Sequence, residues 1–190
     1  MATIDLNSGA LSEHLASATA ALKDGYVIVA PLENSYALVA DAFFHDAVRA
    51  LHVLRGDELG ISAQVMIGSS AAVDGIARDI SEPVRKLINN FWPGQLSINL
   101  KPQRGLNWDL GDGQQLDSFS VRVPSADFIL QLAKAHGPLA VASAAPAGNS
   151  PITDPFDLTF TELEVAAIFS VGPITQGPAT TVIAGDRDPA

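Results

Sequence analysis

The sequence predicts an α/β protein, in which helices pack against a mixed β-sheet. Short, wholly apolar runs are typical of strands buried on both faces, and apolar residues every three or four positions are typical of amphipathic helices. These two patterns alternate along the chain, and some strands follow one another closely enough to pair as hairpins. A chain of 190 residues can bury a substantial core, and we expect a single domain over residues 1–190.

The first sixty residues predict two helices that enclose two strands. Apolar residues at helical spacing begin at Leu11 and stop before Gly25, a residue that commonly ends helices. Residues 26–30 and 36–40 are apolar runs that predict strands, and the proline after the first run cannot donate to a ladder. A second helix is predicted at 46–54, where the apolar residues share one face and a glycine follows shortly after.

The middle of the chain predicts a strand at 63–67, a short helix at 71–80 and a longer helix at 81–91. The longer helix begins with a serine at the N-cap and a glutamate and a proline in the first turn. Residues 95–100 alternate strictly between apolar and polar, which predicts a strand with one face in the core. Residues 102–117 are mostly polar and contain three glycines, so we expect a loop or a loose hairpin.

The last third predicts a strand at 118–123, a helix capped by Ser125 and a buried strand at 139–142. Residues 145–157 contain three prolines and a glycine, and we expect them to form a mobile lid. The segment 159–162 fits a capping box, which predicts a final short helix. Two strands complete the predicted fold, at residues 167–171 and 180–183.

Composition narrows the class of protein. The chain has 11 Lys and Arg against 21 Asp and Glu, a net charge of −10, which argues against a domain that coats nucleic acid, and no DNA partner is expected. No apolar run reaches the ~18 residues that span a bilayer, and the first residues lack the pattern of a signal peptide. The absence of cysteine excludes disulfides and thiolate sites. We therefore expect a cytoplasmic protein without a membrane partner.

Several well-known site patterns are missing from the sequence. It contains no phosphate-binding P-loop, no Gly-x-Gly-x-x-Gly after a strand and no His-Glu-x-x-His helix. The histidines are far apart and lack the spacing of metal ligands, so no metal site is predicted: they are His14, His45, His52 and His136.

Four short segments nevertheless occur in a distinctive order: Pro31–Leu38, Phe91–Leu100, Ser120–Pro124 and Ala142–Ala145. The second contains Trp92-Pro93-Gly94, in which the tryptophan is expected to pack against the sheet and the next two residues to form a turn. Together the segments resemble the YrdC family over roughly residues 12–186. The resemblance implies an open, twisted α/β sheet with flanking helices.

The resemblance also implies an activity. Active members of the YrdC family make threonylcarbamoyl-adenylate for tRNA modification: L-threonine and bicarbonate form a carbamate, which attacks the α-phosphate of ATP and expels pyrophosphate. Such a reaction needs mainly positioning and positive charge near the phosphates. The ligands implied are therefore ATP with Mg²⁺, L-threonine and bicarbonate, and the enzyme class implied is a nucleotidyltransferase. No residue is assigned a catalytic role.

On the phosphate side, the resemblance implies Arg55, Arg122, Ser143, Thr180 and Thr181 as binding residues. Arg55 matches the lysine of the family's Lys-x-Arg pair, and Arg122 belongs to its Arg-x-Pro segment. Ser143 matches the serine of Ser-x-Asn, and the two threonines resemble a late Ser-Thr-Val. From the sequence alone, a helix end for Arg55 and a surface salt bridge for Arg122 are adequate alternatives.

Two positions depart from the family's pattern. Asp57 stands where the second basic residue of Lys-x-Arg is usual, and Ala145 stands where the asparagine of Ser-x-Asn is usual. A carboxylate about 4 Å from a phosphate costs about 4 kcal/mol at an effective dielectric constant of ~20. Rotation of Asp57 away from the phosphates, or its binding to Mg²⁺, would reduce this cost.

On the amino-acid side, the resemblance implies Asn34 and Tyr36 as pocket residues. Both lie in the segment that resembles the family's Pro-Thr-Asp/Glu-Thr-Val-Tyr-Gly-Leu, where Leu32 and Ala37 replace the usual threonine and glycine. Without the resemblance, the same segment predicts a corner between two strands with Tyr36 packed inside. An alternative function also stays open: a non-catalytic YrdC-like paralogue that binds a nucleotide, double-stranded RNA or a protein partner.

Overall fold

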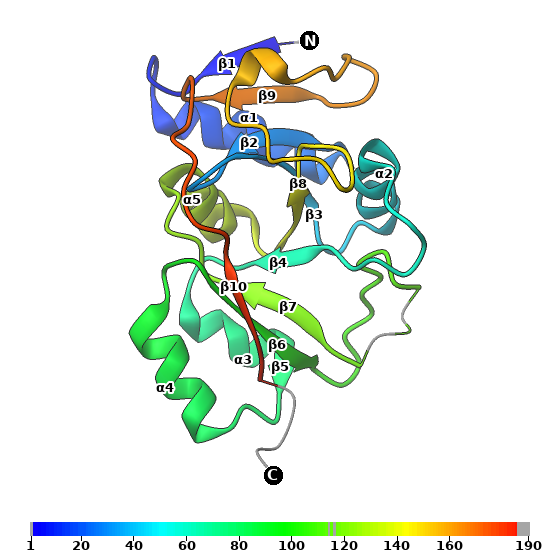
Figure 1. Cartoon of the computed structure of the whole chain (residues 1–190), viewed down its shortest axis with the longest axis vertical. Helices are drawn as coiled ribbons and strands as arrows, with labels where there is room; N and C mark the ends of the chain where they lie inside the picture. Colours follow the sequence, from blue (N-terminus) through cyan, green and yellow to red (C-terminus); the bar gives the residue numbers. More distant parts are fainter. Residues whose placement is uncertain (1, 114, 116, 186–190) are drawn as a thin grey trace.

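The computed structural model describes residues 2–113, 115 and 117–185, and its centre is the predicted mixed sheet (Figure 1). Within those residues ten strands form one open sheet in the order β1-β9-β2-β3-β8-β4-β7-β6-β10, and β5 pairs with β6 off this path. The strands are β1 (Ala2–Asp5), β2 (Ile28–Pro31), β3 (Tyr36–Asp41), β4 (Gln64–Met66), β5 (Ala77–Arg78), β6 (Leu96–Pro102), β7 (Phe119–Arg122), β8 (Leu139–Ser143), β9 (Ala167–Ser170) and β10 (Thr181–Ala184).

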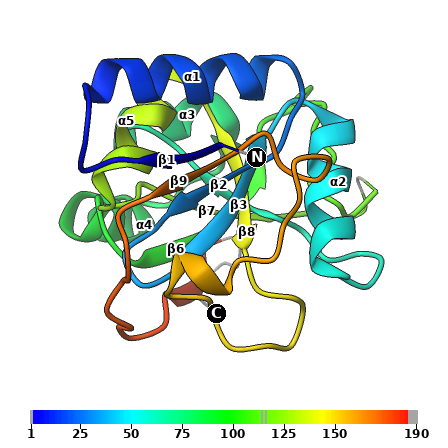
Figure 2. The same ribbon diagram turned by 90° about the horizontal axis from the view of Figure 1, so that it is seen from above.

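Five helices flank the sheet in the described part of the chain: α1 (Leu11–Lys23), α2 (His45–Arg55), α3 (Val73–Ile76), α4 (Glu82–Phe91) and α5 (Asp127–His136). Successive residues of a strand point to opposite faces, and β3 divides its side chains accordingly. Ala37 and Val39 pack in one core cluster with α1 and α5, and Leu38 packs in another with α2. The helices α1 and α5 lie together in the view from above (Figure 2). None of the helices in the described ranges has the length and apolar character to cross a membrane.

The strands at the centre of the sheet bring one group of polar residues together. β2 and β3 form an antiparallel hairpin, and β8 runs antiparallel to both β3 and β4. The register places Ser143 opposite Ala37 and Val141 opposite Gln64. Because α2 packs on β3 and β8, its last residue lies beside these strand ends.

Most predicted elements are confirmed, but two predicted helices are wrong. In place of one helix over 71–80 the chain forms a 3₁₀ turn, the short α3 and then β5, and Asp79 has a positive φ of 58°. The predicted helix after 159–162 is a turn, in which Thr161 donates from its N–H and its hydroxyl to Glu164. One half of a capping box, in which the carboxylate of Glu164 accepts from the N–H of Thr161, is therefore present two residues later than expected, without a helix behind it.

Two further differences concern residues near the site. The sequence predicts that Ser125 caps α5, but its side chain does not, and the residue at the N-cap is Ala126. Instead, the N–H groups of Ser125 and Ala126 donate to the carboxylate of Glu33, at 2.7 and 3.3 Å. The predicted lid at 145–157 is hydrogen-bonded to the body, because Ala147 N–H donates to the carbonyl of Arg55 and Tyr36 N–H donates to that of Ile152. The strand β1, which pairs with β9, was not predicted.

Candidate functional site

Arg55 and Ser143, both predicted on the phosphate side, line one pocket of about 280 Å³, here called the Arg55 pocket. It lies where the end of α2 meets the central strands. Gly56 takes a left-handed conformation with φ 68°, which ends α2 and turns the following residues back beside the helix. The other lining residues are Leu32, Ser35, His52, Asp57, Ile61, Ser62, Ala63, Gln64, Val141 and Ala142.

Arg55 is the arginine of this pocket; it forms an ion pair with Asp57, but its guanidinium donates no hydrogen bond to the described residues. Its side chain is 20% exposed, and its Nε lies 3.4 Å from Oδ1 of Asp57 without forming a hydrogen bond. Among the described residues no acceptor is hydrogen-bonded to any nitrogen of its guanidinium. A guanidinium in this condition offers paired donors to a phosphate or a carboxylate.

Asp57 also lines the pocket, but its carboxylate is bound by a neighbour. The side chain is only 3% exposed, and Oδ2 lies 2.7 Å from Nδ1 of His52. The other ring nitrogen of His52 lies 2.8 Å from the carbonyl oxygen of Leu110. The sequence predicted a carboxylate that repels phosphate; the structure places that carboxylate against a histidine to which the sequence assigned no role.

The remaining polar wall consists of uncharged groups. Ser143 accepts a hydrogen bond from the N–H of Ala145 at 3.2 Å, so the serine of the Ser-x-Asn segment stays at the pocket while the asparagine's amide is absent. Ser35, Ser62 and Gln64 were missed by the sequence analysis. For Gln64 the signal existed, because it is a polar residue at the start of an otherwise apolar strand.

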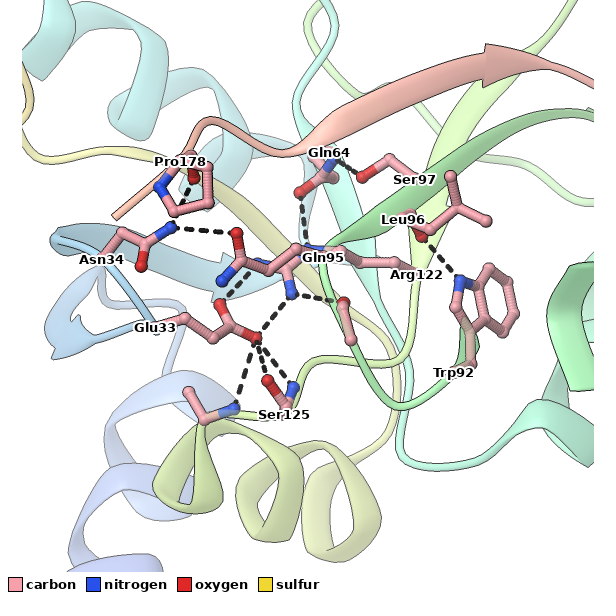
Figure 3. Close-up of polar contacts among 12 residues, drawn as sticks. Glu33, Asn34, Gln64, Trp92, Gln95, Leu96, Ser97, Arg122, Ser125 and Pro178 are labelled. Carbon is pink, nitrogen blue, oxygen red and sulfur yellow. Dashed lines mark hydrogen bonds and ion pairs between the residues drawn. The ribbon is translucent and has the colours of Figure 1, made fainter. Parts of the chain in front are cut away.

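Arg122 does not line the Arg55 pocket; it is buried in an ion pair (Figure 3). Its two terminal nitrogens donate to the two carboxylate oxygens of Glu33 at 2.7 and 2.9 Å, and one of them also donates to the carbonyl of Gly94 at 2.9 Å. Its Nε donates to Oε1 of Gln64 at 3.4 Å. A salt bridge at this position is confirmed, but it is not on the surface, because Arg122 is 2% exposed.

Glu33 is held in its charged form by the same contacts. Burial alone would raise the pKa of its carboxyl, but the hydrogen bonds and the charge of Arg122 outweigh burial and lower that pKa from 4.5 to about 2. Backbone N–H donors at the start of α5 act in the same direction. The pair thus joins β7, the β2–β3 turn and α5 into one structural unit, and the guanidinium is already occupied by a carboxylate of the chain.

Asn34 and Tyr36, predicted on the amino-acid side, bind the chain between β9 and β10. Tyr36 is fully buried: its hydroxyl donates to the carbonyl of Gly172 at 2.7 Å and accepts from the N–H of Val171 at 3.2 Å. The amide of Asn34 donates to the carbonyl of Pro178 and to the side chain of Gln95 at 2.9 Å (Figure 3). Neither residue lines the Arg55 pocket, and the sequence's alternative of a packed Tyr36 at a strand corner matches this geometry.

Thr180 and Thr181 lie apart from the Arg55 pocket. Thr180 is half-buried and Thr181 is exposed, and Thr181 begins β10 at the edge of the sheet, opposite Leu96 of β6. Thr181 lines a different, mainly apolar depression together with Phe91 and Ile183. Of the seven predicted binding residues, the structure therefore brings Arg55 and Ser143 together in one pocket and places the other five elsewhere.

The buried hydroxyl of Tyr36 gives a first prediction. In Tyr36→Phe the N–H of Val171 and the carbonyl of Gly172 lose their partner, and we expect the free energy of unfolding to fall by about 1–3 kcal/mol. Urea unfolding measures it. Tyr26→Phe is the matched control, because Tyr26 is 58% exposed and its loss of a hydroxyl should change stability by less than about 0.5 kcal/mol. Equal effects of the two changes would contradict the structural role.

Comparisons with known proteins agree with this fold. The chain is 34% identical over 170 residues to a Mycobacterium leprae protein named "Putative threonylcarbamoyl-AMP synthase", an alignment that covers 89% of this chain and 76% of the relative. Among solved structures it is similar to Pyrococcus abyssi Sua5 complexed with L-threonine, with a TM-score of 0.86 and 23% identity over 97% of this chain. It spans only 54% of that Sua5 chain.

A second structure, Escherichia coli YciO, matches with a TM-score of 0.83 and 23% identity, over 98% of this chain and 90% of YciO. The family model for Sua5, YciO and YrdC, described as "Telomere recombination", matches residues 20–189. The model covers most of the chain, and the resemblance that the four sequence segments predicted is therefore confirmed. This chain belongs to the Sua5/YciO/YrdC family.

Proposed function

We propose that the chain is a threonylcarbamoyl-AMP synthase whose nucleotide phosphates bind at the Arg55 pocket. The observation that carries the proposal is the guanidinium of Arg55, which lines the pocket beside Ser143 without a hydrogen bond to the described residues. Relatives that bear this enzyme name cover most of the chain, and a Sua5 structure contains L-threonine. In the proposed reaction the amine of L-threonine and bicarbonate form a carbamate with loss of water; a carbamate oxygen then attacks the α-phosphate of ATP, and pyrophosphate leaves.

The residues of the pocket suit the demands of this reaction on the protein. Arg55 neutralises phosphate charge, and the hydroxyl of Ser143 with those of Ser35 and Ser62 orients the phosphate oxygens. Arg122 contributes indirectly, because its ion pair with Glu33 fixes the turn that carries the pocket residues Leu32 and Ser35.

Mg²⁺ fits this site as a companion of ATP and not as a protein-bound ion. In the described ranges no group of three or more His, Asp or Glu side chains could hold a metal ion. Asp57 is engaged by His52, so it is not a ligand. Mg²⁺ commonly keeps its waters and binds to substrate phosphates, where it neutralises charge. One cation on the protein and one on the nucleotide then share the polyphosphate charge.

Pyrophosphate release tests the proposed function directly. Purified protein with ATP and Mg²⁺ should release pyrophosphate only when both L-threonine and bicarbonate are present, and mass spectrometry should detect threonylcarbamoyl-AMP. Omission of L-threonine is the internal control for simple ATP hydrolysis. Nucleotide binding without any threonine-dependent pyrophosphate would contradict the synthase.

The second candidate is a family member that binds a nucleotide without making the product. Two observations favour it: Asp57 stands where the family has a second basic residue, and Ala145 lacks the usual amide. RNA is a less favourable ligand, because the net charge is −10. An RNA-binding paralogue would show an affinity that falls steeply with salt, and no binding at low salt removes that function.

A further inference from the structure

The ring of His52 faces two hydrogen-bond acceptors, which constrains its protonation. Nε2 lies 2.8 Å from a backbone carbonyl oxygen, that of Leu110, and such an oxygen can only accept. Nδ1 lies 2.7 Å from Oδ2 of Asp57, which also only accepts when ionised. A neutral imidazole has one N–H and can satisfy one of the two. Only the imidazolium donates to both.

The proton between His52 and Asp57 is expected on the imidazole ring and not on the carboxyl group. A carboxylic acid is a stronger acid than an imidazolium, so a proton shared by two such groups resides on the imidazole. Arg55, with Nε 3.4 Å from the other oxygen of Asp57, further favours the carboxylate. Gly111 leaves the space that the ring requires, because a Cβ there would lie 2.2 Å from Nε2.

Asp57 therefore lies between two cations that compete for it. With His52 charged, the three residues His52, Asp57 and Arg55 carry a net charge of +1, and the carboxylate is balanced without Arg55. With His52 neutral, their net charge is zero and Arg55 alone balances Asp57. The structure already places Oδ1 of Asp57 3.4 Å from the buried Nε of Arg55, which has no hydrogen-bond partner in the described part of the chain.

We propose that His52 is a positioning residue: its protonated ring holds Asp57 and so leaves Arg55 available to a ligand anion. The inference rests on the proposed role of the Arg55 pocket as an anion site. Anion affinity then falls as pH rises and His52 loses its proton. Other charged groups near His52 line an adjoining pocket, from α2, from the segment after it and from the loop before β7: His45, Arg49, Glu58, Asp109 and Asp112.

Sulfate is the suitable probe, because its charge is constant over the range in which histidine titrates. Calorimetric titration at about pH 5.5 and about pH 8.5 should show affinity falling about tenfold, within the usual size of coupling between two sites. Asp57→Asn should keep the higher affinity at both pH values. Asp46→Asn, which removes the same charge from an exposed position on α2, should retain the wild-type pH dependence. His52→Gln should bind weakly throughout.

A ligand-free measurement protects the test against misfolded variants. In wild-type protein labelled with ¹⁵N-histidine, both ring nitrogens of His52 should show protonated shifts at the lower pH, and one should become unprotonated over the interval in which sulfate affinity falls. If the sulfate affinity of the wild type does not change with pH, the role of His52 is overturned but the anion site is not. A pH dependence that persists in Asp57→Asn has the same consequence. Absence of sulfate binding at both pH values overturns both the inference and the anion site, whereas absence of pyrophosphate release with normal sulfate binding overturns only the synthase.

Discussion

Arg122→Met is expected to destabilise the protein by about 3–5 kcal/mol, because it leaves the carboxylate of Glu33 buried without its cation. Arg85→Met is the matched control: Arg85 pairs with Asp74 at a similar distance of 2.8 Å, but on the surface, with side chains 43% and 57% exposed. Exposed pairs of this kind contribute about 0–1 kcal/mol. Urea unfolding of the two variants measures the difference, and losses of equal size would contradict a structural role for the buried pair.

The double change Arg122→Met with Glu33→Gln sharpens this experiment. Removing both charges leaves no buried ion unpaired, so the double variant should be more stable than Arg122→Met alone. If the double variant is less stable than Arg122→Met alone, the two side chains contribute to stability independently. The ion pair drawn in Figure 3 would then not act as one structural unit.

The same pair predicts how stability responds to acid. The pKa of Glu33 is about 2 in the folded protein and about 4.5 when unfolded, so the unfolded state binds more protons between these values. The stabilisation by the charged carboxylate is fully present above about pH 5 and is lost as pH falls toward 2, by about 3 kcal/mol in total. Glu33→Gln should lack this part of the acid dependence, which urea unfolding at a series of pH values detects.

The fold was largely predictable because its local patterns and its burial agree. The runs at 26–30 and 36–40 are apolar throughout, and both strands of the resulting hairpin are buried on both faces. The strict alternation at 95–100 likewise became β6. The helix predicted over residues 71–80 is wrong because the sequence shows only their helical spacing. The pairing of β5 with β6, which replaces the last turn, depends on residues more than twenty positions away.

The site was less predictable because its pairings are long-range. A resemblance identified Arg55 and Arg122 as two cations of the same kind, yet only one lines the pocket. Nothing local reveals that Glu33 occupies Arg122, because the two side chains are brought together by β7 and the β2–β3 turn. His52 and Asp57 are close in sequence, but their contact needs the left-handed Gly56 that ends α2. Which charged side chains are buried therefore depends on contacts that form only when the sheet is assembled.

Arg55→Gln is expected to weaken ATP binding by about tenfold to a hundredfold, because it removes charge-assisted hydrogen bonds worth about 1.5–3 kcal/mol. Calorimetric titration with ATP and Mg²⁺ measures the loss. Arg49→Gln is the matched control: Arg49 lies on the same helix, has a side chain 72% exposed and does not line the Arg55 pocket. It removes the same charge from the same helix, so it should reduce affinity by less than about threefold through screened long-range attraction.

The variant should remain folded, which makes this comparison interpretable. Arg55 donates no side-chain hydrogen bond to the described residues, and its loss leaves Asp57 still in contact with the ring of His52. Its unfolding midpoint should therefore stay near that of the wild type, in contrast with Arg122→Met. Equal losses of ATP affinity in Arg55→Gln and Arg49→Gln would indicate only the general field of the protein. No loss in either would place the nucleotide outside the Arg55 pocket, because Arg55 is the one arginine or lysine among the described residues that line it.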